Sequence, residues 1–132
     1  MNWNRLIAAS IIWATTSALA QAQELTCPAS LETELSAGST TSSFKFRYVS
    51  FFDGDPSDMA DLAPDDGTNP KVLEQRWQFA RTSERPVIMV CRYHGTDQIV
   101  TKEVPTEVKE CRLSGFVDDQ GEIIGSPSLE CR

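Results

Sequence analysis

Four cysteines constrain the fold of this chain more than any other feature of its sequence: Cys27, Cys91, Cys111 and Cys131. An even number of cysteines in a small exported domain predicts two disulfides, each worth about 2–4 kcal/mol of stability. Four cysteines allow three pairings, and the sequence does not choose among them; we favour Cys27–Cys91 together with Cys111–Cys131. A metal site is a poor alternative, because the chain has no C-x-x-C pair and its only histidine is His94.

The N-terminus has the layout of a secretory signal peptide. One basic residue, Arg5, precedes an apolar stretch over residues 6–14, and small residues follow in two overlapping A-x-A sites. We expect cleavage after Ala22, with Ala20 as the alternative; an uncleaved amphipathic or core helix is the competing interpretation. The prediction is a signal peptide over residues 1–22 and one disulfide-stabilised domain over residues 23–132, located in the periplasm.

The charge of the mature chain argues against several classes of partner. Without the signal, 11 of the 12 basic residues remain beside all 19 acidic ones, which gives a net charge of −8. Nucleic acid and anionic lipid are therefore not expected as partners, since both need Lys and Arg to replace counterions. No apolar run after the signal could span a bilayer, so we expect no membrane insertion after cleavage.

Alternating apolar and polar residues predict a mainly β fold of the α+β class. The clearest strand covers residues 44–52, where Phe44, Phe46 and Tyr48 alternate with Lys45 and Arg47. Further strands are expected over residues 31–35, 72–80, 87–94, 98–104 and 108–117, and a last strand is expected over 122–124 and 128–131. Turns or loops are expected at residues 37–43, 65–70, 94–97 and 118–121. The sum is an antiparallel sheet of about six or seven strands with one short helix, and its core residues include Phe46, Tyr48, Trp77 and Tyr93.

Residues 53–66 contain six aspartates and no basic residue. Such a segment could be a calcium loop that uses Asp53, Asp55, Asp58 and also Asp61. The spacing does not fit an EF-hand, because Asp58 stands where glycine is needed and Pro64 stands where a bidentate glutamate is needed. We favour a short helix over residues 56–63 that is capped by Asp55, with Met59 and Leu62 against the sheet.

Catalytic patterns are weak in this chain. His94 and Asp97 leave a small hydrolase open, but no serine lies in a G-x-S-x-G turn. A small, disulfide-bonded sheet offers a flat or loop-borne contact surface more readily than a deep cleft. We therefore assign no catalytic residue and expect no cofactor.

Two resemblances add to this interpretation. First, a series of short motifs along the chain resembles a family of small exported proteobacterial proteins. That family is named after an enterobacterial locus tag and is known chiefly as uncharacterised. The motifs are Val49-Ser50-Phe51-Phe52-Asp53-Gly54, Pro56, Leu62-Ala63-Pro64, Trp77, Cys91-Arg92-Tyr93, Gly95-Thr96, Val104-Pro105, Cys111 and Cys131. This resemblance implies export and a β-rich domain with two disulfides, and it implies no activity.

The chain is also similar to periplasmic inhibitors of lysozyme in size and compartment. Ser114-Gly115 matches the start of their inhibitory loop motif, but Phe116-Val117 follows where that motif has a tyrosine. We predict a non-enzymatic periplasmic protein that binds an envelope or secreted protein partner. The alternatives are an inhibitor or immunity protein against a cell-wall hydrolase, a calcium-dependent module and a small hydrolase.

Overall fold

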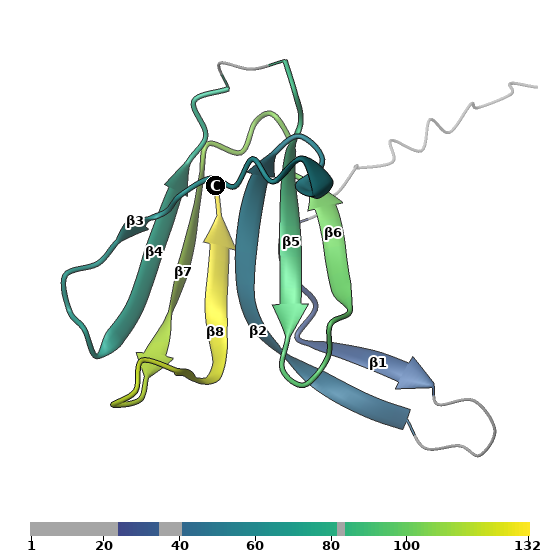
Figure 1. The fold of residues 1–132 in the computed structure, drawn as a ribbon. Helices are drawn as coiled ribbons and strands as arrows, with labels where there is room; N and C mark the ends of the chain where they lie inside the picture. Colours follow the sequence, from purple (N-terminus) through teal and green to yellow (C-terminus); the bar gives the residue numbers. More distant parts are fainter. Residues whose placement is uncertain (1–23, 35–40, 82–83) are drawn as a thin grey trace, which may run out of the picture.

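The protein is built from two four-stranded antiparallel sheets, as a computed structural model shows (Figure 1). The structure describes residues 24–34, 41–81 and 84–132. The predicted signal peptide, residues 1–22, lies outside these ranges. Within them, no helix is long and apolar enough to cross a membrane.

The first sheet has the strand order β1-β2-β5-β6. Its strands are β1 (Ser30–Glu34), β2 (Thr41–Asp53), β5 (Val87–Tyr93) and β6 (Ile99–Glu103). The long strand β2 serves two partners in turn, because its first residues pair with β1 and its remaining length pairs with β5.

The second sheet has the order β3-β4-β7-β8. It consists of β3 (Asp65–Asp66), β4 (Val72–Gln78), β7 (Glu110–Val117) and β8 (Ile123–Cys131). The two sheets meet where β8 lies beside β2 (Figure 1).

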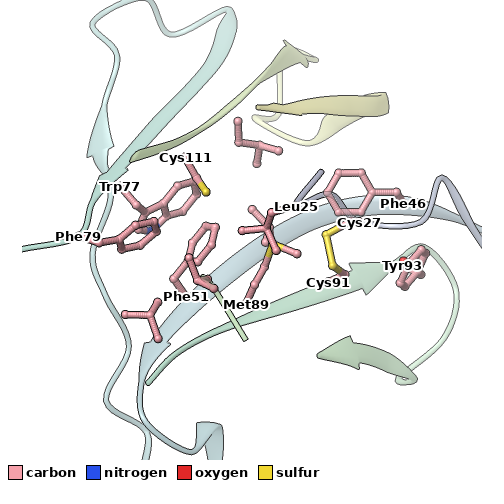
Figure 2. Close-up of a cluster of buried hydrophobic side chains, with 14 residues drawn as sticks. Leu25, Cys27, Phe46, Phe51, Trp77, Phe79, Met89, Cys91, Tyr93 and Cys111 are labelled. Atoms are coloured by element: carbon pink, nitrogen blue, oxygen red, sulfur yellow. A yellow bond between two sulfur atoms is a disulfide. The ribbon is translucent and has the colours of Figure 1, made fainter. Parts of the chain in front are cut away.

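One hydrophobic core joins the inner faces of both sheets (Figure 2). Phe51 of the first sheet is fully buried, and its ring centroid lies 4.9 Å from that of Trp77 and 5.1 Å from that of Phe79. The Trp77 indole Nε1–H donates a hydrogen bond of 2.9 Å to the Leu62 carbonyl. Burying large aromatic side chains supplies much of the folding free energy in a domain of this size.

A β-bulge in β2 decides which of its aromatic residues enter the core. The register between β2 and β5 shifts between Phe46 and Tyr48, so the residues that face inward change from Phe46 to Val49 and Phe51. Tyr48 is consequently only partly buried and packs at the margin of the core. The guanidinium of Arg92 lies 5.8 Å from the Tyr48 ring centroid, within range of a cation–π contact.

Tyr93, at the end of β5, is buried and packs edge-on against Phe46 with 6.1 Å between ring centroids. Its hydroxyl donates a hydrogen bond of 3.0 Å to the Pro28 carbonyl. Burial raises the pKa of the Tyr93 phenol, because the charged phenolate would lose its hydration.

Two disulfides are present, as the cysteine count predicts. The longer one joins Cys27, which precedes β1, to Cys91 in β5, across a sequence separation of 64 residues. The shorter one joins Cys111 and Cys131, which are direct partners in the ladder between β7 and β8 and are 20 residues apart. One disulfide thus ties the N-terminal segment to the first sheet, and the other lies within the second sheet.

The predicted helix over residues 56–63 is wrong. Only a single 3-10 turn, η1 (Pro56–Asp58), forms behind the Asp55 cap, and Met59 then adopts a left-handed conformation with φ of 58°. The chain returns along β2 instead, where Asp53 N–H donates to Ala60 O and Leu62 N–H donates to Phe51 O. These backbone groups are therefore not free to form a helix. Met59 is 83% exposed rather than packed on the sheet, whereas Leu62 does pack against the core.

Three other predicted boundaries change, and the single predicted sheet is replaced by two. Residues 41–43 of the predicted loop belong to β2, because they pair with β1; residues 37–40 lie outside the described residues. Residues 65–66 form β3 by pairing with β4, which brings the number of strands in the described residues to eight. The expected break at Gly125–Pro127 is a bulge inside a continuous β8, accommodated by a φ of 70° at Gly125.

Candidate functional site

The acidic segment, residues 53–66, runs from the end of β2 through η1 to β3. Asp55 is the cap of η1: its carboxylate accepts hydrogen bonds from the Ser57 hydroxyl at 2.7 Å and from the Ser57 backbone N–H at 2.8 Å. These two bonds lower the pKa of Asp55, because they stabilise its charged form. Asp58 forms an ion pair with Arg85. Asp55 and Asp58 thus interact with different partners, Ser57 and Arg85.

The aspartates proposed for calcium do not converge in the described part of the chain. Across residues 24–34, 41–81 and 84–132, no group of three or more His, Cys, Asp or Glu side chains is arranged to hold a metal ion. Asp53 instead borders a small cavity, while Asp55 and Asp58 take the partners given above.

Gly54 is a position where both the backbone conformation and the packing require glycine. Its φ is 88°, and a Cβ atom there would lie 2.2 Å from an Nη atom of Arg85. The Arg85 guanidinium therefore lies directly over the Gly54 backbone while it pairs with Asp58. This arrangement joins η1 to the segment that leads into β5.

The cavity beside the acidic segment has a volume of about 170 Å³, below the range of about 300–1,000 Å³ typical of small-molecule sites. It is lined by Asp53, Leu62, Gln78, Phe79, Ala80, Arg81, Arg85 and Val87. Arg81 uses one Nη atom to donate to the carbonyls of Val104, Pro105 and Val108, so it holds the β6–β7 connection in place. The lining is thus largely occupied by structural contacts.

His94, the histidine of the hydrolase hypothesis, follows β5. Its backbone N–H donates to the Lys45 carbonyl at 2.9 Å, and its ring Nε2 lies 3.4 Å from the Gly125 carbonyl oxygen. Within the residues that the structure describes, neither a serine hydroxyl nor a carboxylate hydrogen-bonds this ring. Through these contacts His94 links the β5–β6 turn to β8.

The outer face of the second sheet carries a feature that the sequence analysis missed. Val72, Phe116 and Ile124 are direct neighbours across β4, β7 and β8, and together they form an apolar row. Phe116 is 68% exposed, Ile124 is 57% exposed and Val72 is partly buried. The signal was present in the sequence, because strand alternation places Phe116 on the face opposite to Leu113, which is fully buried.

Ser114 and Gly115, which match the lysozyme-inhibitor motif, lie inside β7 and not in a loop. Ser114 faces outward and is exposed. Gly115 faces inward, where a Cβ atom would come within 3.2 Å of Pro127. A small residue is thus needed at position 115 by packing between β7 and the β8 bulge.

The fold and these surfaces define a class: a small, disulfide-bonded, mostly β protein with exposed sheet and loop surfaces. Comparison with known proteins gives the family. The chain belongs to the Type VI secretion system Tli immunity protein family, whose model matches residues 40–132. This finding matches the immunity-protein alternative of the sequence analysis.

A curated relative from Azospirillum brasilense, an uncharacterised 16.3 kDa protein of the trpG 5′ region, is 28% identical over 138 residues. The alignment covers 93% of this chain and 92% of that protein. No solved structure matches the chain. The resemblance to a family named after a locus tag stays a prediction.

Proposed function

We propose that this protein is a non-enzymatic immunity protein that binds a type VI effector in the periplasm and neutralises it. The observation that carries the proposal is the match of residues 40–132 to the Tli immunity family. The absence of a catalytic arrangement around His94 in the described residues is consistent with a binding role. An immunity protein acts by forming a complex, and exposed sheet and loop surfaces suit that task.

The location in the periplasm rests on two features. The disulfides require an oxidising compartment, which the periplasm provides and the cytosol does not. The N-terminal pattern over residues 1–22 would direct the chain there. An effector that acts in the envelope, such as a cell-wall hydrolase, would be met in the same compartment.

The strong negative charge of the mature chain favours a basic partner. Opposite net charges accelerate the diffusional encounter of two proteins, and this acceleration falls as salt rises. Three residues of the acidic segment are exposed, so their charges contribute to the electrostatic potential around the protein: Asp61, Asp65 and Asp66. We therefore expect the effector to carry a cationic surface.

A growth-protection assay tests the proposal. Type VI effectors encoded near the gene for this chain are targeted one at a time to the periplasm of a host bacterium, with or without the chain. Protection against one of them by the full-length chain is the expected result, together with co-purification of the two proteins. A chain that starts at residue 23 and stays in the cytoplasm is the matched control, and it should not protect.

Failure of the full-length chain to protect against any of these effectors would contradict the proposal. Equal protection by the chain without residues 1–22 would contradict the periplasmic location and leave the immunity function standing. Because only the compartment differs between the two versions, the two claims are tested separately.

A further inference from the structure

The apolar row of Val72, Phe116 and Ile124 is placed by strand register. Phe116 lies directly between Val72 of β4 and Ile124 of β8 in the ladder. Directly opposed side chains on one face of a sheet lie about 4.5–5.5 Å apart at Cβ, so the three form one continuous contact surface. Single exposed apolar residues are ordinary on protein surfaces, but an aligned row that includes an exposed phenylalanine is not.

The second sheet has no layer over this face in the described residues. Its inner face carries the buried Trp77, Cys111 and Leu113, while the outward residues beside Phe116 on β7, Arg112 and Ser114, are exposed. The contacts of this sheet with the first one run through β8 and the shared core (Figure 1). Within residues 24–34, 41–81 and 84–132, the outer face is therefore open to a partner.

Acidic groups border the row at the β7–β8 turn and on β4. Asp118, Asp119 and Glu122 lie in the turn between β7 and β8, next to the end of the row, and Glu74 follows Val72 by two residues on β4. Glu122 is also 3.4 Å from the Arg47 guanidinium, with which it forms an ion pair. The turn is held in shape because the Asp118 carboxylate accepts hydrogen bonds of 2.9 Å from the backbone N–H groups of both Gln120 and Glu122. A preformed surface loses little conformational entropy on binding.

We propose that this apolar row, with its acidic rim, is the surface that contacts the effector, and that the effector presents an apolar patch bordered by Lys and Arg. The inference rests on the proposed immunity function and deepens it. An exposed aromatic residue at the centre with charges around it is the usual arrangement of a protein interface. A second copy of this chain fits less well, since face-to-face pairing would bring the carboxylates of two acidic rims together.

Binding measurements with the effector identified in the protection assay test the inference. The probe is that purified effector, immobilised, with the mature disulfide-bonded chain in solution. Phe116→Ser combined with Ile124→Ser is expected to raise Kd about 30-fold, as loss of an interface hot spot does. Ile99→Ser is the matched control: Ile99 is also exposed but lies in β6 of the other sheet, and Kd should stay within about twofold.

The acidic rim is tested by association rates. Asp119→Lys should slow association several-fold at low salt, and this effect should shrink at high salt. Glu107→Lys, on the exposed β6–β7 connection at the opposite end of β7, makes the same charge change away from the row and should have a smaller effect.

The outcomes separate this inference from the function on which it rests. A parent chain that binds no effector overturns both. A parent chain that binds, with an unchanged Kd in the Phe116→Ser, Ile124→Ser variant, overturns only the assignment of the surface. A parent chain that is dimeric, and that becomes monomeric in this variant without loss of effector binding, assigns the row to self-association and also overturns the inference.

Discussion

Trp77 is the residue whose replacement should destabilise this domain most clearly. Its side chain is 4% exposed, and it connects the second sheet to Phe51 of the first sheet and, through its indole N–H, to the Leu62 carbonyl. Truncation of a buried tryptophan to alanine costs about 3–5 kcal/mol. The aromatic pair adds about 0.5–1.5 kcal/mol beyond simple burial, so we expect Trp77→Ala to cost about 4 kcal/mol.

Trp77→Phe separates packing from hydrogen bonding. A phenylalanine keeps an aromatic ring against Phe51 but leaves the Leu62 carbonyl without its donor. The loss of a single partly buried hydrogen bond costs about 1–2 kcal/mol. The phenylalanine variant should therefore be destabilised by less than half as much as the alanine variant.

Urea unfolding of the oxidised chain from residue 23 onward measures these changes. Far-UV circular dichroism is the suitable probe, because Trp77 is the only tryptophan after residue 22 and its fluorescence is lost in the variants. With an m-value of about 2 kcal/mol/M, Trp77→Ala should lower the urea midpoint by about 2 M. Phe116→Ala, at an exposed position, is the control and should change stability by no more than about 0.5 kcal/mol. A Trp77→Ala midpoint within about 0.3 M of the parent would refute the assignment of this residue to the core.

Three further predictions concern the disulfides, calcium and pH. Loop-closure entropy predicts a stabilisation of about 4 kcal/mol from the longer disulfide, with a separation of 64 residues, and of about 3 kcal/mol from the shorter one, with a separation of 20. In urea unfolding, replacing both cysteines of the longer disulfide by alanine should therefore lower the free energy of unfolding more than the same change at the shorter one. The reverse order would contradict the entropic argument. Calcium should leave the melting temperature unchanged relative to chelator, since the described aspartates do not converge; a clear rise would restore the calcium hypothesis. Because the pKa of Asp55 is lower in the folded chain than its ordinary value, its stabilising effect is present above about pH 4 and is lost as the pH falls through the folded value. The stability difference between the parent and Asp55→Ala should therefore shrink on acidification, and a difference that grew would contradict this sign.

Local sequence patterns were sufficient for most of the strands. Residues 72–78, 87–93 and 99–103 form strands close to the predicted limits, because alternation and apolar runs report directly on which faces of a strand are buried. The helix at 56–63 failed for a non-local reason. A cap residue and a following proline favour a helical start at any position, but here the backbone of Ala60 and Leu62 bonds to β2, which a local pattern does not reveal.

The candidate contact surface was likewise only partly predictable from the sequence. The exposed position of Phe116 follows from alternation within β7, and could have been read from the sequence. Its alignment with Val72 and Ile124 could not, since that depends on the register of three strands and on two extra residues in the β8 bulge. The acidic segment was visible from composition, whereas the separate partners of Asp55 and Asp58 were not.

By itself, the amino-acid sequence determined the β class, the approximate strand positions and the number of disulfides, because alternation and cysteine count are properties of short segments and of composition. Tertiary structure alone decided that there are two sheets, which cysteines meet, and that Tyr48 leaves the core while Phe51 enters it. Each of these outcomes depends on which distant strands pair and in what register. A shift of one residue, as at the β2 bulge, reverses the face that every following side chain occupies.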